Sequence, residues 1–289
     1  MLLGYIEPTT GQMLSATWER QRHDAEKRRN LFRGISRLLL SISRIELPRI
    51  GSWVFHEDGT ISLSNRPLTC GIAILEQDGA PRVIQRNQTY TCVEPYVSDL
   101  LAFHDGRFLA QPNAANNERD CRFQMAVQAL LRTISHHYYD RNLLYGPFVM
   151  QFSDLHASNI LVDSDWNITG LIDLEWMCSR PTEMLDVPYW ITGLGIDEVG
   201  DAENIEDYVQ TWEEFMAILE GEEQKARVHH EHKISLSKIM RRTWETNSCW
   251  FTHCLDSVNG MYALFDQHLR PQFVRFYLTE KMEVLMSRF

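Results

Sequence analysis

The sequence predicts an α+β fold that is mainly helical, with one small β element inside it. Three observations lead to this prediction. Apolar residues recur at helical spacing between residues 15 and 46. Residues 147–176 have the pattern of short strands joined by polar turns, and most of the chain after Pro188 again has helical patterns. The order along the chain is therefore helices, a small β element, and helices again.

Each element has its own local signal. Leu31, Ile35 and Ile42 lie on one face of the first helical segment, which we expect to be one helix or a pair, and Pro48 stops it. Alternating apolar residues on both sides of Asp58–Gly59 predict a β-hairpin. The remaining expectations are an irregular segment over 66–90, helices over 95–108, 118–139, 203–223, 244–268 and 272–286, and strands over 148–152, 160–162 and 168–172.

The composition is typical of a folded protein with a net negative charge. Apolar residues make up 44% and charged residues 23% of the 289 residues, which is typical of a globular protein. Lys and Arg number 28 against 39 Asp and Glu, a net charge of -11. This balance argues against a nucleic-acid or anionic-membrane binder, whose affinity depends on basic side chains. It leaves room for a small phosphorylated ligand, which needs only a local site.

Targeting signals and cysteine spacing indicate a cytoplasmic protein. No apolar run approaches the ~20 residues that span a bilayer, and the first residues lack the basic and apolar regions of a signal peptide. The six cysteines form no CxxC pair and no framework spacing, so we expect reduced thiols. No Pro-, Gly- or Ser-rich linker divides the chain, which favours one domain over residues 1–289.

The most informative polar residues lie between 153 and 173. Asp154 and Asn159 are five residues apart on one loop, and two strands separate them from Asp173. A hairpin returns its last residue close to its first, so Asp173 is expected beside Asn159. Two carboxylates and one amide oxygen therefore converge. Phosphoryl transfer needs a carboxylate to orient the attacking hydroxyl and hard oxygen ligands for Mg²⁺, and the Asp-x4-Asn spacing with a downstream Asp matches that need.

The amino-acid sequence around Asp154, Asn159 and Asp173 resembles that of a known family. Residues 148–176, FVMQFSDLHASNILVDSDWNITGLIDLEW, are similar to the catalytic segment of aminoglycoside phosphotransferase and choline-kinase-like enzymes, in which HGDLHPGN is followed by a strand pair and IDWE. RPTEMLDVPYWITG is most similar to the large fungal branch of that family. The resemblance implies the carboxyl-terminal lobe of a protein-kinase-like fold, with the catalytic and metal-binding segment at 147–176 and a helical, substrate-side region at 186–289.

The resemblance also implies roles for individual residues. Asp154 matches the catalytic base, and Asn159 and Asp173 match the ligands of Mg²⁺. His156 matches a histidine often found in this loop, for which a structural hydrogen bond and a direct catalytic role both remain open, and Glu175 matches an acidic residue after the metal-binding Asp. Phe152 and Ser153 replace the His and Gly of the usual HGD. The implied cofactors are ATP and Mg²⁺, and the implied acceptor is a small-molecule hydroxyl.

Parts of the family pattern are absent from the sequence. No Gly-rich phosphate loop precedes Asp154, and Lys27, the one lysine before it, lies in a charged helical segment. Tyr5, Ile6 and Glu7 resemble the strand that links the two lobes and meets the adenine, so residues 1–12 are expected to be hinge-like, with the amino-terminal lobe absent. Two functions are therefore possible. The first is a phosphotransferase-type domain. The second is a truncated, inert kinase-like module that binds either a ligand or, at the face left by the missing lobe, a protein partner.

Overall fold

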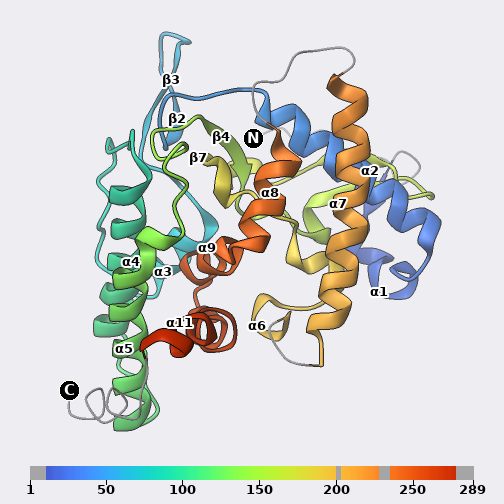
Figure 1. Ribbon diagram of the computed structural model, residues 1–289. Helices are drawn as coiled ribbons and strands as arrows, with labels where there is room; N and C mark the ends of the chain where they lie inside the picture. Colours follow the sequence, from blue (N-terminus) through green and yellow to red (C-terminus); the bar gives the residue numbers. More distant parts are fainter. Residues whose placement is uncertain (1–10, 200–202, 228–234, 278–289) are drawn as a thin grey trace.

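The computed structural model describes residues 11–199, 203–227 and 235–277, and it confirms an α+β fold that is mainly helical. The strands of this part form three small sheets, in the orders β1-β5-β6, β2-β3 and β4-β7. Figure 1 shows α4 and α5 on one side and α2 and α7 on the other, with strands β4 and β7 between them. This arrangement places the end of β4, where the candidate site begins, in the middle of the molecule.

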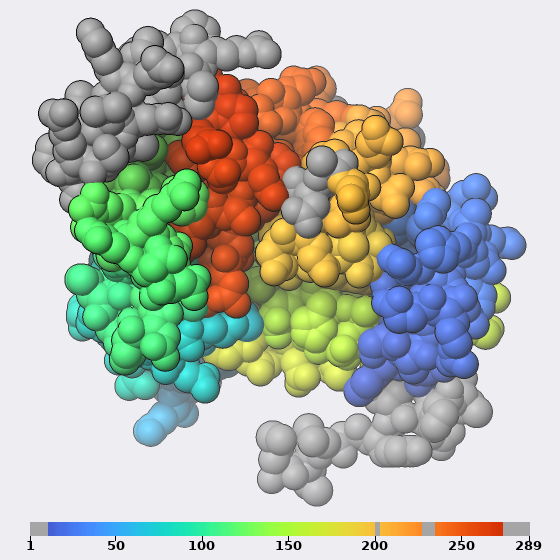
Figure 2. Space-filling view, turned by 90° about the horizontal axis from the view of Figure 1, so that it is seen from below, coloured from blue at the N-terminus to red at the C-terminus, as the bar shows by residue number. Residues whose placement is uncertain are grey.

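The first helical segment is divided, as one of the two expectations allowed. A short strand, β1 (Gln12–Met13), precedes it, and the segment itself comprises a 3₁₀ helix (Leu14–Ala16), α1 (Trp18–Gln21) and α2 (Ala25–Ser43). Asp24 begins α2, because its carboxylate accepts hydrogen bonds from the amides of Glu26 and Lys27. The apolar face of α2 is buried and packs against α7 (Ile205–Arg227). In Figure 2 the amino-terminal helices accordingly lie against the segment that contains α7.

The hairpin around Asp58–Gly59 is confirmed. β2 (Ser52–Phe55) pairs antiparallel with β3 (Ile61–Asn65), and Gly59 has a φ of 81°, which glycine adopts without strain. The hairpin extends away from the body of the molecule in Figure 1.

The expectation of an irregular segment over 66–90 was wrong in part, because α3 (Cys70–Gln77) forms there. The hydroxyl of Thr69 accepts a hydrogen bond from the amide of Ile72 and so caps the helix. Gly71 lets the helix approach α9 (Ser248–Asp256), since a Cβ at this position would lie 2.8 Å from the carbonyl oxygen of Asp256. A helix of this length shows too few turns for a clear apolar period in the sequence.

The two helices expected next are present. α4 (Val93–Ala110) and α5 (Glu118–Ile134), which a short 3₁₀ turn extends, pack against each other. Asn117 caps α5 through a hydrogen bond from the amide of Asp120.

The β element holds the expected strands and one that the sequence did not reveal. β5 (Ile160–Val162) pairs with β6 (Ile168–Leu171), and β4 (Phe148–Phe152) pairs antiparallel with β7 (Met177–Pro181). β7 was missed because it contains Arg180 and ends at Pro181, and both residue types are unusual in a buried strand.

The carboxyl-terminal helices are shorter than the sequence suggested. The single helix expected over 244–268 is broken by Asn247, in a left-handed conformation with a φ of 60°, and again after Asp256. The elements of this region, besides α7 and α9, are α6 (Ile196–Val199), α8 (Leu236–Glu245), α10 (Met261–Leu264), a π-helix over 265–269 and α11 (Arg270–Tyr277). The expected helix over 272–286 lies largely outside the described residues. Among the helices that are described, none has the length and apolar character needed to cross a membrane.

Glu183 provides a test of this packing. Its carboxylate accepts the backbone amide of Asp140 at 3.0 and 3.2 Å, and burial raises its pKa to about 7. Because the folded chain holds this proton more tightly than the unfolded chain, the stability that the protonated carboxyl contributes is lost as the pH rises from 4.5 through about 7. We expect Glu183→Gln to raise the free energy of unfolding by about 1–2 kcal/mol at pH 8 and to leave it nearly unchanged at pH 4.

Urea denaturation of both chains at the two pH values measures this difference. Glu57→Gln, at an exposed position in the β2–β3 turn, is the matched control and should change neither value. Equal destabilisation of Glu183→Gln at pH 4 and pH 8 would contradict the prediction.

Candidate functional site

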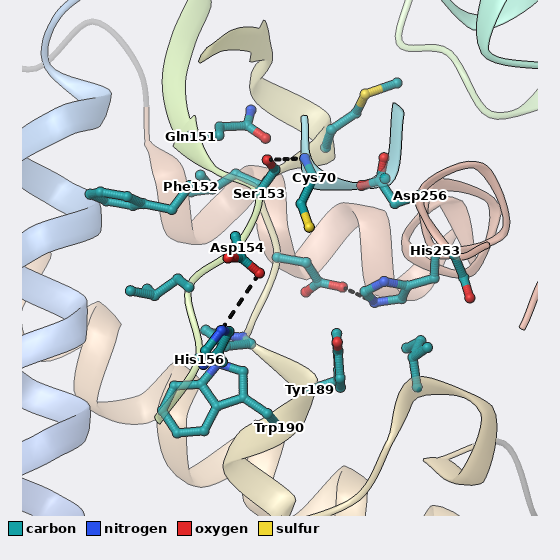
Figure 3. Close-up of a pocket in the computed structure, with 18 of the residues that line it drawn as sticks. Cys70, Gln151, Phe152, Ser153, Asp154, His156, Tyr189, Trp190, His253 and Asp256 are labelled. Atoms are coloured by element: carbon teal, nitrogen blue, oxygen red, sulfur yellow. Dashed lines mark hydrogen bonds and ion pairs between the residues drawn. The ribbon is translucent and has the colours of Figure 1, made fainter. Parts of the chain in front are cut away.

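The candidate site begins where β4 ends. The chain leaves β4 at Phe152, passes through Ser153 and Asp154 in a loop, and enters a 3₁₀ helix (Ala157–Asn159) that leads directly into β5. Since β4 belongs to one sheet and β5 to another, this loop lies at the junction of the two sheets. Figure 3 shows the Asp154 side chain pointing away from β4 into a pocket.

The structure brings Asp154, Asn159 and Asp173 to one small pocket. The amide nitrogen of the buried Asn159 side chain donates to the backbone oxygen of Asp154 at 2.9 Å, with the Asp154 carboxylate 3.4 Å away. The backbone amide of Ile172 donates to the Asn159 carbonyl at 3.0 Å, which closes the β5–β6 hairpin and places Asp173 beside Asn159. Asp173 is exposed and takes a left-handed conformation with a φ of 54°. Asparagine and aspartate tolerate this conformation better than most residues.

His156 makes a hydrogen bond within the loop and lies near the Asp154 carboxylate. Its Nδ1 accepts a hydrogen bond from the amide of Ser158 at 3.3 Å, which caps the 3₁₀ helix, and its Nε2 lies 3.7 Å from the Asp154 carboxylate. The imidazole is therefore held by the loop and directed toward Asp154 (Figure 3). The hinge-like residues Tyr5, Ile6 and Glu7 lie outside the described residues.

Ser153 and Cys70 are contacts of the site that the sequence did not reveal. The Ser153 hydroxyl donates to the carbonyl oxygen of Trp176 at 2.7 Å and accepts the amide of Cys70 at 3.1 Å. Ser153 thus connects the loop to the segment after Asp173 and to the start of α3. The Cys70 thiol points toward Asp154 in Figure 3. Burial, and then the charge of Asp154, raise the pKa of this thiol to about 11.

A cavity of about 430 Å³ opens beside Asp154, a volume suited to a small molecule. Its walls come from the start of α3, the end of β4, β7, the loop over 185–190, and the segment that follows α9. Arg180, which is 3% exposed, forms one wall and donates to both carboxylate oxygens of Asp256 at 2.6 and 2.8 Å. Tyr189 and Trp190 supply aromatic surface on another side (Figure 3).

The side chains that line the small pocket carry oxygen atoms of the kinds that hard divalent cations take as ligands. Two carboxylates and one amide oxygen are the ligand types that Mg²⁺ prefers, and Mg²⁺ usually takes only one or two carboxylates from a protein. In the described part of the chain, neither this pocket nor any other place holds a group of three or more His, Cys, Asp or Glu side chains that could bind a metal ion. All six cysteines are free thiols, three of them buried.

Comparisons of the chain with family models, with curated proteins and with solved structures found no match.

The contact between Cys70 and Asp154 can be tested by thiol chemistry. Since only the thiolate reacts, the raised pKa should make Cys70 slow to alkylate at pH 8.5. Asp154→Asn removes the negative charge while burial remains, so we expect Cys70 to react severalfold faster in this variant. Mass spectrometry of iodoacetamide-labelled peptides measures the rate, with the half-buried Cys121 as internal control. A rate for Cys70 that does not change would place its thiol outside the field of Asp154.

Proposed function

We propose that the chain is a phosphotransferase-type domain, the helical carboxyl-terminal lobe of a protein-kinase-like fold of the aminoglycoside phosphotransferase type. One observation carries the proposal. Asp154, Asn159 and Asp173 line a single small pocket at the junction of two sheets, and a cavity of small-molecule size adjoins Asp154. The resemblance of residues 148–176 to the catalytic segment of that family supports the same conclusion.

Each residue has a role in the proposed reaction. Asp154 would orient an acceptor hydroxyl in the adjoining cavity and accept its proton. Asn159 and Asp173 would hold Mg²⁺, which when bound neutralises charge on the phosphates of ATP. Asn159 would also have a structural role, because its side-chain hydrogen bond to the backbone oxygen of Asp154 holds the loop between β4 and β5 in place. His156 would hold the orientation of the Asp154 carboxylate from the other side.

The second candidate is an inert kinase-like module that binds a ligand or a protein partner. A specific observation favours it: Lys27, the one lysine among residues 1–153, is hydrogen-bonded to Gln21, and neither residue lines the small pocket or the cavity. The Lys27 ammonium lies on α2 and donates to Gln21 at 2.9 Å. A protein partner would occupy the face that the amino-terminal lobe covers in two-lobed kinases. Exposed apolar side chains such as Leu174, next to Asp173, offer it contact area.

Metal binding tests the donor set directly. We expect Mn²⁺, a paramagnetic substitute for Mg²⁺, to bind the purified chain in the presence of ATP, and Asp173→Asn to weaken its binding at least about tenfold, a loss that follows from removing one charged ligand. Water-proton relaxation or electron paramagnetic resonance measures the affinity. Asp165→Asn, on the exposed turn of the same hairpin, is the control and should bind Mn²⁺ normally. Equal affinity in both variants would remove Asp173 from the site.

Turnover tests whether the chain alone is catalytically active. Because loss of one well-placed charged donor already costs a factor of hundreds to a thousand, we expect the 289-residue chain alone to hydrolyse or transfer phosphate from ATP at a negligible rate. A coupled ADP-release assay at saturating Mg²⁺ measures this rate. Robust turnover that disappears in Asp154→Ala would exclude the inert module and establish Asp154 as catalytic.

A further inference from the structure

The floor of the cavity beside Asp154 carries two buried polar side chains that the proposed reaction does not use. Gln151 on β4 is 2% exposed and Arg180 on β7 is 3% exposed, and both line the cavity. Glutamine and arginine are mostly found at the surface of proteins, and burying them costs free energy unless their polar atoms have partners. The hydrogen bonds of the two side chains therefore show what each does in the fold and which atoms it leaves available.

The antiparallel register of β4 and β7 places the two side chains on one face of the strand pair. Gln151 is opposite Cys178, which is two residues before Arg180 on β7. Opposite residues share a face, and so do residues two apart on a strand, so Gln151 and Arg180 are diagonal neighbours about 7–8 Å apart. A ligand group of a few atoms that forms hydrogen bonds at both ends can bridge a separation of this size.

Each side chain uses only part of its hydrogen-bonding capacity within the protein. The Gln151 amide nitrogen donates to the carbonyl oxygen of Pro181 at 2.6 Å, which leaves the amide oxygen, Oε1, as an acceptor. The Arg180 Nη2 donates to both carboxylate oxygens of Asp256 and contacts the sulfur of Met184. The Arg180 Nη1 carries two N–H groups, and no described residue accepts a hydrogen bond from them.

The two available atoms keep access to the cavity. The Arg180 Nε is shut off from solvent and has no partner, whereas the Arg180 Nη1 and the Gln151 Oε1 have no partner but retain accessible surface. Both residues line the cavity and are otherwise buried, so this surface faces the cavity. Figure 3 shows Gln151 and Asp256 at the upper end of the pocket, with Asp154 below them. The floor therefore offers a donor and an acceptor to a bound molecule.

Charges around the floor disfavour a charged group at this position. The guanidinium of Arg180 is always protonated, and the carboxylate of Asp256 balances its charge. Asp154, Asp186 and Asp197 also line the cavity, so a carboxylate at the floor would be repelled by further negative charge. An ammonium group would face the guanidinium and would leave the N–H groups of Nη1 without an acceptor.

A carboxamide matches the two atoms. Its carbonyl oxygen accepts a hydrogen bond from the Arg180 Nη1, and its N–H group donates to the Gln151 Oε1. A hydroxyl group would have to make both bonds through one oxygen atom, so the diagonal separation of the two side chains favours the amide. Tyr189 and Trp190, on another side of the cavity, suit the apolar part of a ligand held in this way.

We propose that Arg180 and Gln151 bind a carboxamide group of the acceptor, so that the cavity takes a small alcohol with a carboxamide at its other end. The hydroxyl would lie at Asp154 and the carboxamide at the floor. The place of the reacting hydroxyl rests on the proposed function, whereas the binding of a carboxamide by Arg180 and Gln151 does not.

A matched series of benzyl alcohols tests the proposal without nucleotide or metal. The series is 4-(hydroxymethyl)benzamide and the compounds in which a carboxylate, an aminomethyl, a hydroxymethyl or a methyl group replaces the carboxamide. We expect the benzamide to bind about tenfold tighter than the methyl compound, the factor that a hydrogen bond to a charged group gives, and tighter than the other three. Nuclear magnetic resonance titration of the Gln151 side-chain amide signals, assigned by their loss in Gln151→Met, measures affinity at this site.

Variants separate ligand binding from a structural role. Gln151→Met keeps the length of the side chain and removes the amide, so it should bind the benzamide about fivefold more weakly and the methyl compound unchanged, as measured by calorimetry. Gln85→Met, at an exposed position, is the control and should retain the full preference. If Gln151→Met does not fold, the comparison of the five compounds on the unaltered chain still decides.

Three results would overturn the proposal: a benzamide that binds no tighter than the methyl compound, a carboxylate, amine or diol that binds tighter than the benzamide, or an equal loss of both ligands in Gln151→Met. Since no ATP or Mn²⁺ is present, these results do not depend on the phosphotransferase proposal. Absence of Mn²⁺ binding with an intact preference for the benzamide would reject the proposed function alone.

Discussion

The site depends on the register of the β5–β6 hairpin. Pairing of Ile160 with Leu171 closes the hydrogen bond from Ile172 to Asn159 and so puts Asp173 beside Asn159. A slip of one residue would turn every side chain of the strand to the opposite face. The turn fixes the register, because Trp166 is fully buried and its indole nitrogen donates to the Thr17 hydroxyl at 3.1 Å. A side chain at the turn of the hairpin therefore determines whether Asp173 comes to lie beside Asn159.

Ser153 extends this constraint to the cavity. Its hydroxyl contacts the carbonyl of Trp176, which follows the Asp173 turn, and the amide of Cys70, which begins α3. The residue next to Asp154 thus joins three segments that are distant in the sequence. Ser153 stands where the HGD motif that this segment resembles has glycine, and its side chain hydrogen-bonds the loop to two other segments. The departure from the usual motif consequently adds contacts around Asp154.

Local signals predicted the parts of the fold that local interactions determine. The hairpin at Asp58–Gly59, the strands β4, β5 and β6, and the proximity of Asp173 to Asn159 all follow from short-range patterns. α3 was missed because its stability depends on one cap and on close packing at Gly71, although Thr69 before Ile72 and Leu75 was a usable signal. The cavity could not be foreseen, since Asp186 and His253 meet only through tertiary packing, and so do Arg180 and Asp256.

The aromatic contacts beneath the site have an optical consequence. Trp18 stacks on Trp166 with 5.4 Å between ring centroids, and its edge meets Trp190, also at 5.4 Å. Trp190 lines the cavity, so excitation absorbed at the hairpin turn can pass through neighbouring indoles to a fluorophore at the cavity wall. Emission from this cluster would respond to changes in polarity at that wall. The molecule in this way carries a built-in spectroscopic reporter that links hairpin integrity to cavity occupancy without an attached dye.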